Sequence, residues 1–259
     1  MPAMSLEVGM DDTTTTTTTT TSSPSSSNNE TTIEPVYFSN GCFWGRQYDF
    51  VQTEQKLLGR SPEEVTAVAG YAAGKIPSDK VCYYYTPEKD TVYERLGHAE
   101  AVQVELRAKT PEEKEQQFRS FADTYFKQFR KLPGGKMLRL DPQDAGPGYR
   151  NVVGIPGGVG GPLFKILQEA NINNMELREG RGGAWDADGA PLEDDLLNVV
   201  WVVDSESLPF YQAEKYHQFH DGLGHPFPDS YKKDVKQAVM KAGRLKDSTG
   251  CPEYFFLGS

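Results

Sequence analysis

The stretch VYFSNGCFWGRQYDF, residues 36–50, places one cysteine between a glycine and two large aromatic residues. Residues 36–39 have the composition of a short strand. Residues 42–58 carry apolar side chains near helical spacing, and Gly59 follows as a stop signal. The segment therefore predicts a strand, a tight glycine turn and a helix, with Cys42 at the junction.

The rest of the chain continues this alternation of strands and helices. Further strands are predicted at residues 65–71, 99–106, 151–155, 175–178 and 197–204, and further helices at residues 111–130, 162–170, 209–220 and 230–243. This order predicts an α/β (α+β) fold in which helices cover a mixed sheet with a split β-α-β core. A regularly alternating, doubly wound sheet is not expected.

Length and composition set the domain count. The chain has 259 residues, and residues 13–21 are an unbroken threonine run followed by a serine-rich stretch. Residues 1–32 are therefore predicted to be a disordered tail. Residues 33–259 have a suitable size for one domain with a substantial core.

Charge and hydropathy exclude several partners. The net charge is -10 and lysine and arginine form no cluster, which argues against nucleic acid and against an anionic membrane. No apolar run approaches the roughly 18 residues of a membrane-spanning helix, and the N-terminus lacks the basic character of a signal or transit peptide. We expect a soluble, cytoplasmic protein.

The cysteines and histidines do not form a recognisable metal motif. The three cysteines are too few and too widely spaced for a disulfide scaffold, and no C-x-x-C pair is present. His217 and His220 are three residues apart on an expected helix, but no Asp, Glu or Cys stands at metal-ligand spacing around them. They are interpreted as helix surface, and no metal is expected.

Cys42 has two interpretations. At the start of a helix it would face unpaired N–H groups and the positive end of the helix dipole, so its pKa is expected to fall below the free value of about 8.5. Gly41 would allow the sharp turn, and Gly45 would keep the first helical turn slim enough for a ligand. Alternatively, Cys42 is a small buried hydrophobe. Position alone favours neither.

Two neighbouring features favour chemistry. Phe43 and Trp44 can wall an apolar pocket beside the thiol, suited to a thioether-like methyl group. Glu100 begins the strand at residues 99–106, and alternation would turn it toward the buried side, where its pKa would rise and the carboxyl would remain protonated. It would then serve as a proton donor. The alternative is a solvent-exposed glutamate at the edge of the strand.

Two later segments add candidate groups. Residues 141–150 form a turn-rich loop whose glycines and prolines hold Asp144 and Tyr149 in place, although these could equally be a turn cap and a packed ring. Cys251 lies on a C-terminal segment without periodicity, from which it could reach a catalytic thiol. Cys82 competes for that role, and a buried tail cysteine is the alternative for Cys251.

Three motifs resemble those of one family. GCFWG at residues 41–45, GYAAG at residues 70–74 and GHAEAV at residues 97–102, in this order, are similar to the type A peptide methionine sulfoxide reductases. The likeness extends to residues 144–149 and to FYQAEKYHQ at residues 210–218. It spans nearly everything after Ile33, which would make residues 33–259 the catalytic domain.

The resemblance implies a role for each site residue. Cys42 would attack the sulfoxide sulfur and become a sulfenic acid, Phe43 and Trp44 would hold the methyl group, and Glu100 would protonate the oxygen. Asp144 and Tyr149 would support the substrate, with Tyr149 donating a hydrogen bond to the oxygen.

The resemblance also implies the partners. A second thiol would resolve the sulfenic acid as a disulfide that thioredoxin reduces. The family acts on methionine-S-sulfoxide in proteins and as the free amino acid, and has an α/β sandwich on a split β-α-β core. No bound cofactor is implied, and a monomer is expected.

Four departures from the family pattern bear on the site. Gln47 stands where the family usually has Glu, and Ala145 replaces a His. The loop before Gly97 has a different sequence, in which Tyr83, Tyr84, Tyr85 and Tyr93 are all available for the second oxygen-binding tyrosine; Tyr93 is our choice. The resolving cysteine varies within the family, so Cys251 is assigned from its terminal position, with Cys82 as the alternative.

Two other functions stay open. The departures at Gln47 and Ala145 allow a methionine-sulfoxide-binding or redox-sensing protein that kept the pocket but lost turnover. A cysteine hydrolase or acyltransferase using Cys42 and His98 is a weaker alternative, because no residue in the sequence is evident to orient the imidazole.

Overall fold

The computed structural model describes residues 30–222 and 224–253. Thr31–Ser259 form one compact unit. The predicted N-terminal tail therefore lies outside the described residues except for its end, and Thr32 already belongs to the first strand. Among the described residues, no helix is long and apolar enough to cross a membrane.

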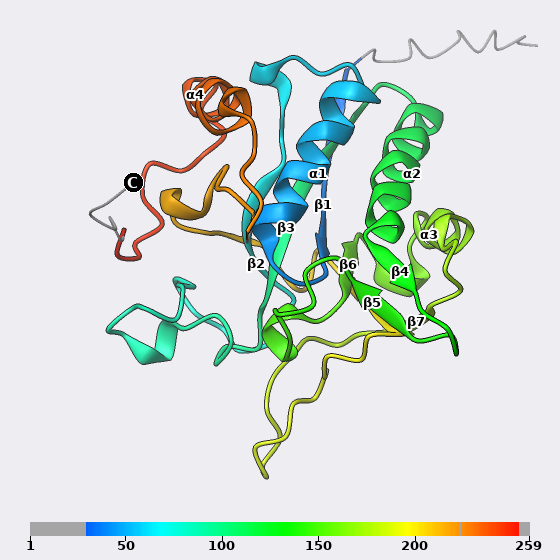
Figure 1. Cartoon of the computed structure of the whole chain (residues 1–259), viewed down its shortest axis with the longest axis vertical. Coiled ribbons are helices and arrows are strands. Elements are labelled where there is room, and N and C mark those ends of the chain that lie inside the picture. Colours follow the sequence, from blue (N-terminus) through cyan, green and yellow to red (C-terminus); the bar gives the residue numbers. More distant parts are fainter. Residues whose placement is uncertain (1–29, 223, 254–259) are drawn as a thin grey trace, which may run out of the picture. The chain divides into compact units, whose positions relative to one another are not determined.

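A mixed sheet forms the centre of the domain (Figure 1). Its seven strands, in the order β7-β8-β6-β1-β3-β2-β9, are β1 (Thr32–Ser39), β2 (Val68–Ala72), β3 (Ala99–Ala108), β6 (Val152–Ile155), β7 (Glu176–Glu179), β8 (Val199–Asp204) and β9 (Tyr211–Gln212). β6, β8 and β7 are parallel, whereas β1, β2, β3 and β9 are joined by antiparallel pairs. The prediction of a mixed, helix-covered sheet is confirmed.

Three helices lie against one face of this sheet, namely α1 (Phe43–Lys56), α2 (Pro111–Lys127) and α3 (Phe164–Ala170) (Figure 1). Thr110 caps α2 by accepting a hydrogen bond from the Glu113 N–H. A helical segment of Ser230–Val235 and α4 (Lys236–Lys241) follows near the C-terminus. A separate hairpin joins β4 (Phe129–Lys131) and β5 (Met137–Arg139).

Side-chain alternation along β1 places the main core on the helical face. Val36 and Phe38 are buried in the cluster that α1 and α2 also enter, whereas Tyr37 between them joins a smaller cluster on the opposite face. β1 is paired on both sides, with β3 and with β6. The residues directly after β1, including Cys42, are therefore held by the centre of the sheet.

The predicted helix at residues 209–220 is wrong. That segment contains β9 and a 3₁₀ turn at Lys215–His217. The segment forms a strand instead of a helix because it pairs with β2 at the edge of the sheet. Gly70 of β2 has no side chain and so lets β9 approach: a Cβ at Gly70 would lie 2.2 Å from the Tyr211 carbonyl oxygen. The β4–β5 hairpin was not predicted either.

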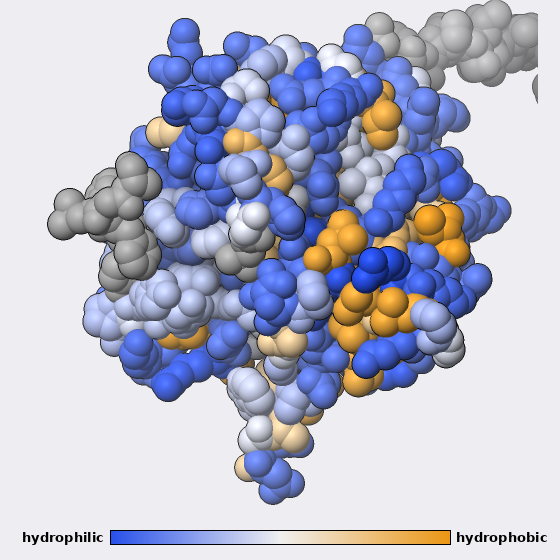
Figure 2. Space-filling view, viewed as in Figure 1, coloured by the Kyte–Doolittle hydropathy of each residue, from blue (hydrophilic) through white to orange (hydrophobic). Residues whose placement is uncertain are grey.

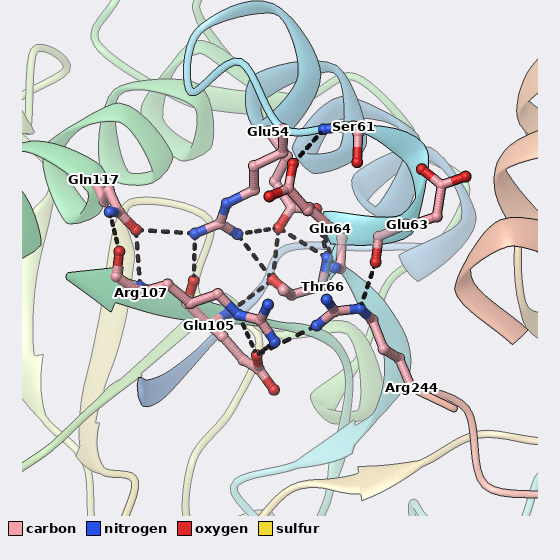
Figure 3. Close-up of polar contacts among 11 residues, drawn as sticks. Glu54, Ser61, Glu63, Glu64, Thr66, Glu105, Arg107, Gln117 and Arg244 are labelled. Atoms are coloured by element: carbon pink, nitrogen blue, oxygen red, sulfur yellow. Dashed lines mark hydrogen bonds and ion pairs between the residues drawn. The ribbon is translucent and has the colours of Figure 1, made fainter. Parts of the chain in front are cut away.

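A buried polar cluster fixes the C-terminal part of α1 to the sheet (Figure 3). The Glu54 side chain is fully buried, pairs with Arg60, and accepts hydrogen bonds from the backbone N–H and the hydroxyl of Thr66. Arg60 also donates to the Glu105 carbonyl at 2.8 Å and to the Gln117 side chain at 2.9 Å. One ion pair thus joins α1, the segment just before β2, β3 and α2.

The surface seen in Figure 2 is mostly hydrophilic, in line with the net charge of -10. Apolar side chains gather where β4 and β5 lie in Figure 1. Leu140, just after β5, is 57% exposed.

Candidate active site

Cys42 occupies the predicted junction between strand and helix. It is the N-cap residue of α1, with φ -63° and ψ 127°, and Gly41 before it has φ +84°, which favours glycine. The Gly41 N–H donates to the Tyr149 carbonyl at 2.9 Å. Cys42 is 6% exposed and is the only cysteine of the chain outside a disulfide.

Cys42 opens into a pocket of about 310 Å³. Its walls come from the start of α1, the loop between β2 and β3, β3 itself, the loop before β6 and the 3₁₀ turn at Lys215–His217. The lining residues are Cys42, Phe43, Trp44, Tyr83, Tyr84, Tyr85, Glu100, Asp144, Tyr149, Tyr216 and His217. Most of the predicted site residues, although far apart in the sequence, therefore meet in one place.

Glu100 lies on β3 opposite Tyr71 of β2 and is 2% exposed, which excludes the solvent-exposed alternative. Its Oε2 accepts a hydrogen bond from the Phe43 N–H at 3.1 Å. Burial raises the pKa of this carboxyl well above its ordinary value, and this effect outweighs the Phe43 hydrogen bond, which lowers it. The predicted direction of this shift, which favours the protonated carboxyl, agrees with the structure.

The predicted lowering of the Cys42 pKa is wrong. Burial raises the pKa of the thiol well above its ordinary value, and the negative charge of an ionised Glu100 acts in the same direction. The backbone N–H of Trp44, the contribution of the helix start, lowers it but does not compensate. The site thus favours a neutral thiol, beside a carboxyl whose own pKa is raised.

The two aromatic residues after Cys42 take different positions. Phe43 is 1% exposed and forms the floor of the pocket. Trp44 is half-buried, and its Nε1–H donates to His217 Nδ1 at 3.2 Å. Burial lowers the pKa of His217 to about 3, so the imidazole is neutral and Nδ1 can accept this bond. His217 was interpreted as helix surface, but it is buried and orients the indole.

The tyrosine-rich loop contributes three rings to the pocket wall, those of Tyr83, Tyr84 and Tyr85. Tyr93, our choice from this loop, is fully buried and stacks on Tyr71 with 4.8 Å between ring centroids. Its hydroxyl is hydrogen-bonded to Tyr149. Tyr93 thus reaches the site through Tyr149, while Tyr83 faces the pocket directly.

Asp144 and Tyr149 are held by a buried arginine. Arg139 donates to the Asp144 carbonyl at 2.8 Å and to the Tyr149 carbonyl at 2.6 Å, and it forms an ion pair with Asp195. Burial raises the pKa of the Asp144 carboxyl, whereas the positive charge of Arg139 lowers it. The prediction that this loop is held is confirmed, but Arg139 and Asp195 had no sequence signal, being 56 residues apart.

Gln47 has a structural role that its position in the motif did not suggest. It is fully buried, donates to the Ala67 carbonyl at 3.0 Å and to Gln218 at 3.1 Å, and accepts from the Phe219 N–H at 2.6 Å. Gln47 therefore ties α1 to the segment that carries His217. Ala145, the other departure, is exposed.

Glu214 was not identified from the sequence. This carboxylate is 3% exposed and accepts from the Tyr71 hydroxyl at 2.8 Å and from the Tyr83 N–H at 2.9 Å. It thus positions Tyr83 in the pocket wall. Glu214 lies in the FYQAEKYHQ segment, but its contact partner Tyr83 is 131 residues away, so no local pattern indicated this role.

Cys82 and Cys251, the two candidate resolving thiols, form a disulfide with each other, with 5.6 Å between their Cα atoms. The structure therefore corrects the expectation that one of them is available to Cys42 as a free thiol. Cys251 is also 8% exposed, so its terminal position does not leave it in solvent. The two residues are 169 positions apart, which concealed the pairing.

His98 does not line the pocket. Its Nδ1 accepts from the Gly74 N–H at 2.9 Å, and a Cβ at Gly74 would lie 2.5 Å from the ring. Burial lowers the pKa of His98 to about 3, which makes it a poor base at neutral pH. GYAAG and GHAEAV are thus joined by a structural contact, and the hydrolase alternative using Cys42 and His98 has no support.

No protein-family model and no curated protein matches this chain. Among solved structures, the chain is similar to methionine sulfoxide reductase A of Corynebacterium diphtheriae, with 16% identity over 72% of each chain and a TM-score of 0.40. Mxr1 from Saccharomyces cerevisiae matches in its reduced form with 20% identity over 71% of this chain and 82% of that chain, at a TM-score of 0.41. The unusual oxidized form of Mxr1 matches with 18% identity over 72% of this chain and 78% of that chain, at a TM-score of 0.35.

Proposed function

We propose that this protein is a thiol-dependent reductase of methionine-S-sulfoxide, in proteins and as the free amino acid. One observation carries the proposal: the Cys42 thiol, at a helix start, lines the same aromatic pocket as the buried carboxyl of Glu100, whose pKa is raised by burial. A sulfoxide needs both a soft nucleophile for its sulfur and an acid for its oxygen. Phe43 and Trp44 supply an apolar surface for its methyl group.

In the proposed reaction the sulfoxide oxygen accepts hydrogen bonds from the Glu100 carboxyl and from Tyr149. The carboxyl gives its proton to this oxygen as the Cys42 sulfur attacks the substrate sulfur, and it takes up the proton that the thiol loses. Cys42 and Glu100 line the same pocket, which supports this exchange. This attack forms an S–S bond between Cys42 and the substrate. The hydroxyl then moves from the substrate sulfur to the Cys42 sulfur as the S–S bond breaks and its electron pair returns to the substrate sulfur, so the products are methionine and a Cys42 sulfenic acid.

We propose that Cys82 and Cys251 complete the cycle. In the reduced protein one of them attacks the sulfenic acid, which releases water and forms a disulfide with Cys42. The other then displaces Cys42 from that disulfide, which yields the Cys82–Cys251 disulfide of this structure. An external dithiol, for which thioredoxin is our candidate, returns this pair to thiols.

The test is reduction of a methionine-S-sulfoxide substrate by the full chain with dithiothreitol. Cys42→Ser is expected to abolish it. Cys251→Ser is the control, because dithiothreitol can reduce the sulfenic acid directly, and this variant should lose turnover with thioredoxin only. Activity that survives in Cys42→Ser would sink the proposal. A disulfide map after one equivalent of sulfoxide shows which thiol resolves.

A sulfoxide-binding or redox-sensing protein is the second candidate. The raised pKa of the Cys42 thiol favours it, because a neutral thiol is a weak nucleophile. Steady-state turnover with thioredoxin separates the two: the sensor binds sulfoxide peptides but does not sustain methionine release.

A further inference from the structure

Three buried side chains converge near the disulfide. Cys82, Glu214 and Cys251 come from three segments of the chain, and their sulfur atoms and a carboxylate oxygen all lie within 4.8 Å of one another. They are 0%, 3% and 8% exposed, respectively. Two sulfur atoms and a carboxylate at such distances are a metal-ligand set once the disulfide is reduced.

The carboxylate is oriented as metal ligands usually are. Glu214 accepts the Tyr71 hydroxyl on Oε2 and the Tyr83 N–H on Oε1, so its position is fixed from two sides. Hydrogen bonds of this kind hold a ligating carboxylate in place in known metal sites. Glu214 also lies beside Cys82, because it accepts the N–H of Tyr83, the residue directly after Cys82.

The two sulfur atoms stay close without the disulfide because other contacts hold both segments. The Cys82 N–H donates to the Thr91 carbonyl at 2.8 Å, and the Cys82 carbonyl accepts from the Tyr93 N–H at 2.9 Å. On the other side, the Glu253 carboxylate accepts from the Lys215 N–H at 2.9 Å, directly after Glu214. The segment of Cys251 is therefore tied to the segment of Glu214 independently of the disulfide.

We propose that reduction of the Cys82–Cys251 disulfide creates a Zn²⁺ site whose ligands are the two sulfur atoms and the Glu214 carboxylate, with water at a fourth position. Zn–S bonds of about 2.3 Å and Zn–O bonds of about 2.0–2.2 Å place tetrahedral ligand atoms less than about 4 Å apart. The two sulfur atoms, bonded to each other in this structure, would move apart on reduction, and the Glu214 oxygen already lies within 4.8 Å of both. Thiolate ligands favour Zn²⁺ over Mg²⁺ or Ca²⁺. This site does not depend on the reductase activity.

The redox and proton balance is simple. A dithiol reductant gives two electrons to the disulfide and becomes a disulfide itself, leaving two thiols in the protein. Zn²⁺ binding then releases one proton from each thiol, and the bound ion offsets the negative charge of two thiolates and a carboxylate in a buried site. An external disulfide that takes two electrons from the thiolates restores the Cys82–Cys251 disulfide, removes both sulfur ligands and expels the ion.

The experiment is a Zn²⁺ titration of the full chain, reduced with a non-chelating phosphine, followed by metal analysis after gel filtration. One equivalent is expected in the reduced protein and none in the disulfide form. Cys251→Ser should abolish binding, Glu214→Gln should weaken it at least tenfold, and Cys42→Ser is the matched cysteine control that should bind normally. Cd²⁺ in place of Zn²⁺ should produce the thiolate-to-metal absorption band.

Two results would overturn the site: absence of stoichiometric metal from the reduced wild type, or binding that follows Cys42 instead of Cys251. Equal affinity in Glu214→Gln would overturn the role of the carboxylate. If that variant does not fold, Glu214→Asp decides the point in the same way, because its shorter side chain withdraws the oxygen from the sulfur atoms.

Discussion

At the scale of single residues, Glu100 shows how burial changes the chemistry of a carboxyl. It is 2% exposed, and its pKa is raised because desolvation outweighs the Phe43 N–H bond. The same burial makes the Cys42 thiol neutral in the resting site. The proposed chemistry therefore begins from two neutral groups that exchange a proton through the substrate.

Glu100→Gln tests the acid. The amide keeps the shape of the side chain but has no acidic proton, so kcat for sulfoxide reduction should fall by about 10²–10⁴, the usual contribution of general acid catalysis. Single-turnover release of methionine measures the chemical step, and circular dichroism checks the fold. Normal turnover in this variant would mean that another group protonates the oxygen.

The same residue makes stability depend on pH. The folded-state pKa of Glu100 is raised, so its contribution to stability is fully present below the unfolded value of about 4.3 and is lost as pH rises through the folded-state pKa. Glu100→Gln lacks this dependence. Wild type should therefore lose stability relative to the variant as pH increases, which paired melting curves measure; parallel curves at all pH values would contradict this.

At the scale of elements, the pocket depends on contacts between α1 and the segment after β9. Gln47 makes these contacts with Gln218 and Phe219, and the segment carries Glu214 and His217. These long-range contacts also explain why the helix predicted at residues 209–220 is wrong. β9 pairs with β2 and Gln47 holds the turn, and these contacts override helical spacing.

Gln47→Ala should destabilise the protein by about 1–3 kcal/mol, because it leaves the buried Phe219 N–H without its acceptor. It should also raise KM, since His217 and the indole of Trp44 lose their support. Urea unfolding and steady-state kinetics measure the two effects. Gln55→Ala, at a half-buried position of the same helix, is the control and should change neither.

At the scale of the whole molecule, one buried ion pair joins four parts of the chain. Glu54 and Arg60 connect α1, the segment before β2, β3 and α2. Figure 3 shows Glu54, Thr66, Glu105 and Gln117 gathered in this cluster. Removing one partner leaves a buried charge uncompensated, so Glu54→Ala should cost about 3–5 kcal/mol of unfolding free energy. The exposed pair Arg178–Glu176 is the control, and Glu176→Ala should cost less than about 1 kcal/mol. Chemical denaturation of both variants tests this; similar losses would contradict it.

Much of the architecture was predictable because it depends on local patterns. Alternation in β1 and β3, the Thr110 cap of α2 and the glycine turn before Cys42 are all readable along the chain. The mixed sheet followed from their order. The β4–β5 hairpin and β9 were missed because both are short, and pairing decides them more than side-chain pattern does.

The sequence by itself determined where Cys42 and Glu100 stand on their elements, since the periodicities of strand and helix are local properties, whereas it left open whether Glu100 faces inward or solvent. Only the tertiary structure decided the rest: that burial outweighs the helix start at Cys42, that Glu214 and His217 position the pocket, and that Cys82 pairs with Cys251. These features arise from desolvation and from contacts between residues more than 100 positions apart, and no local pattern records either.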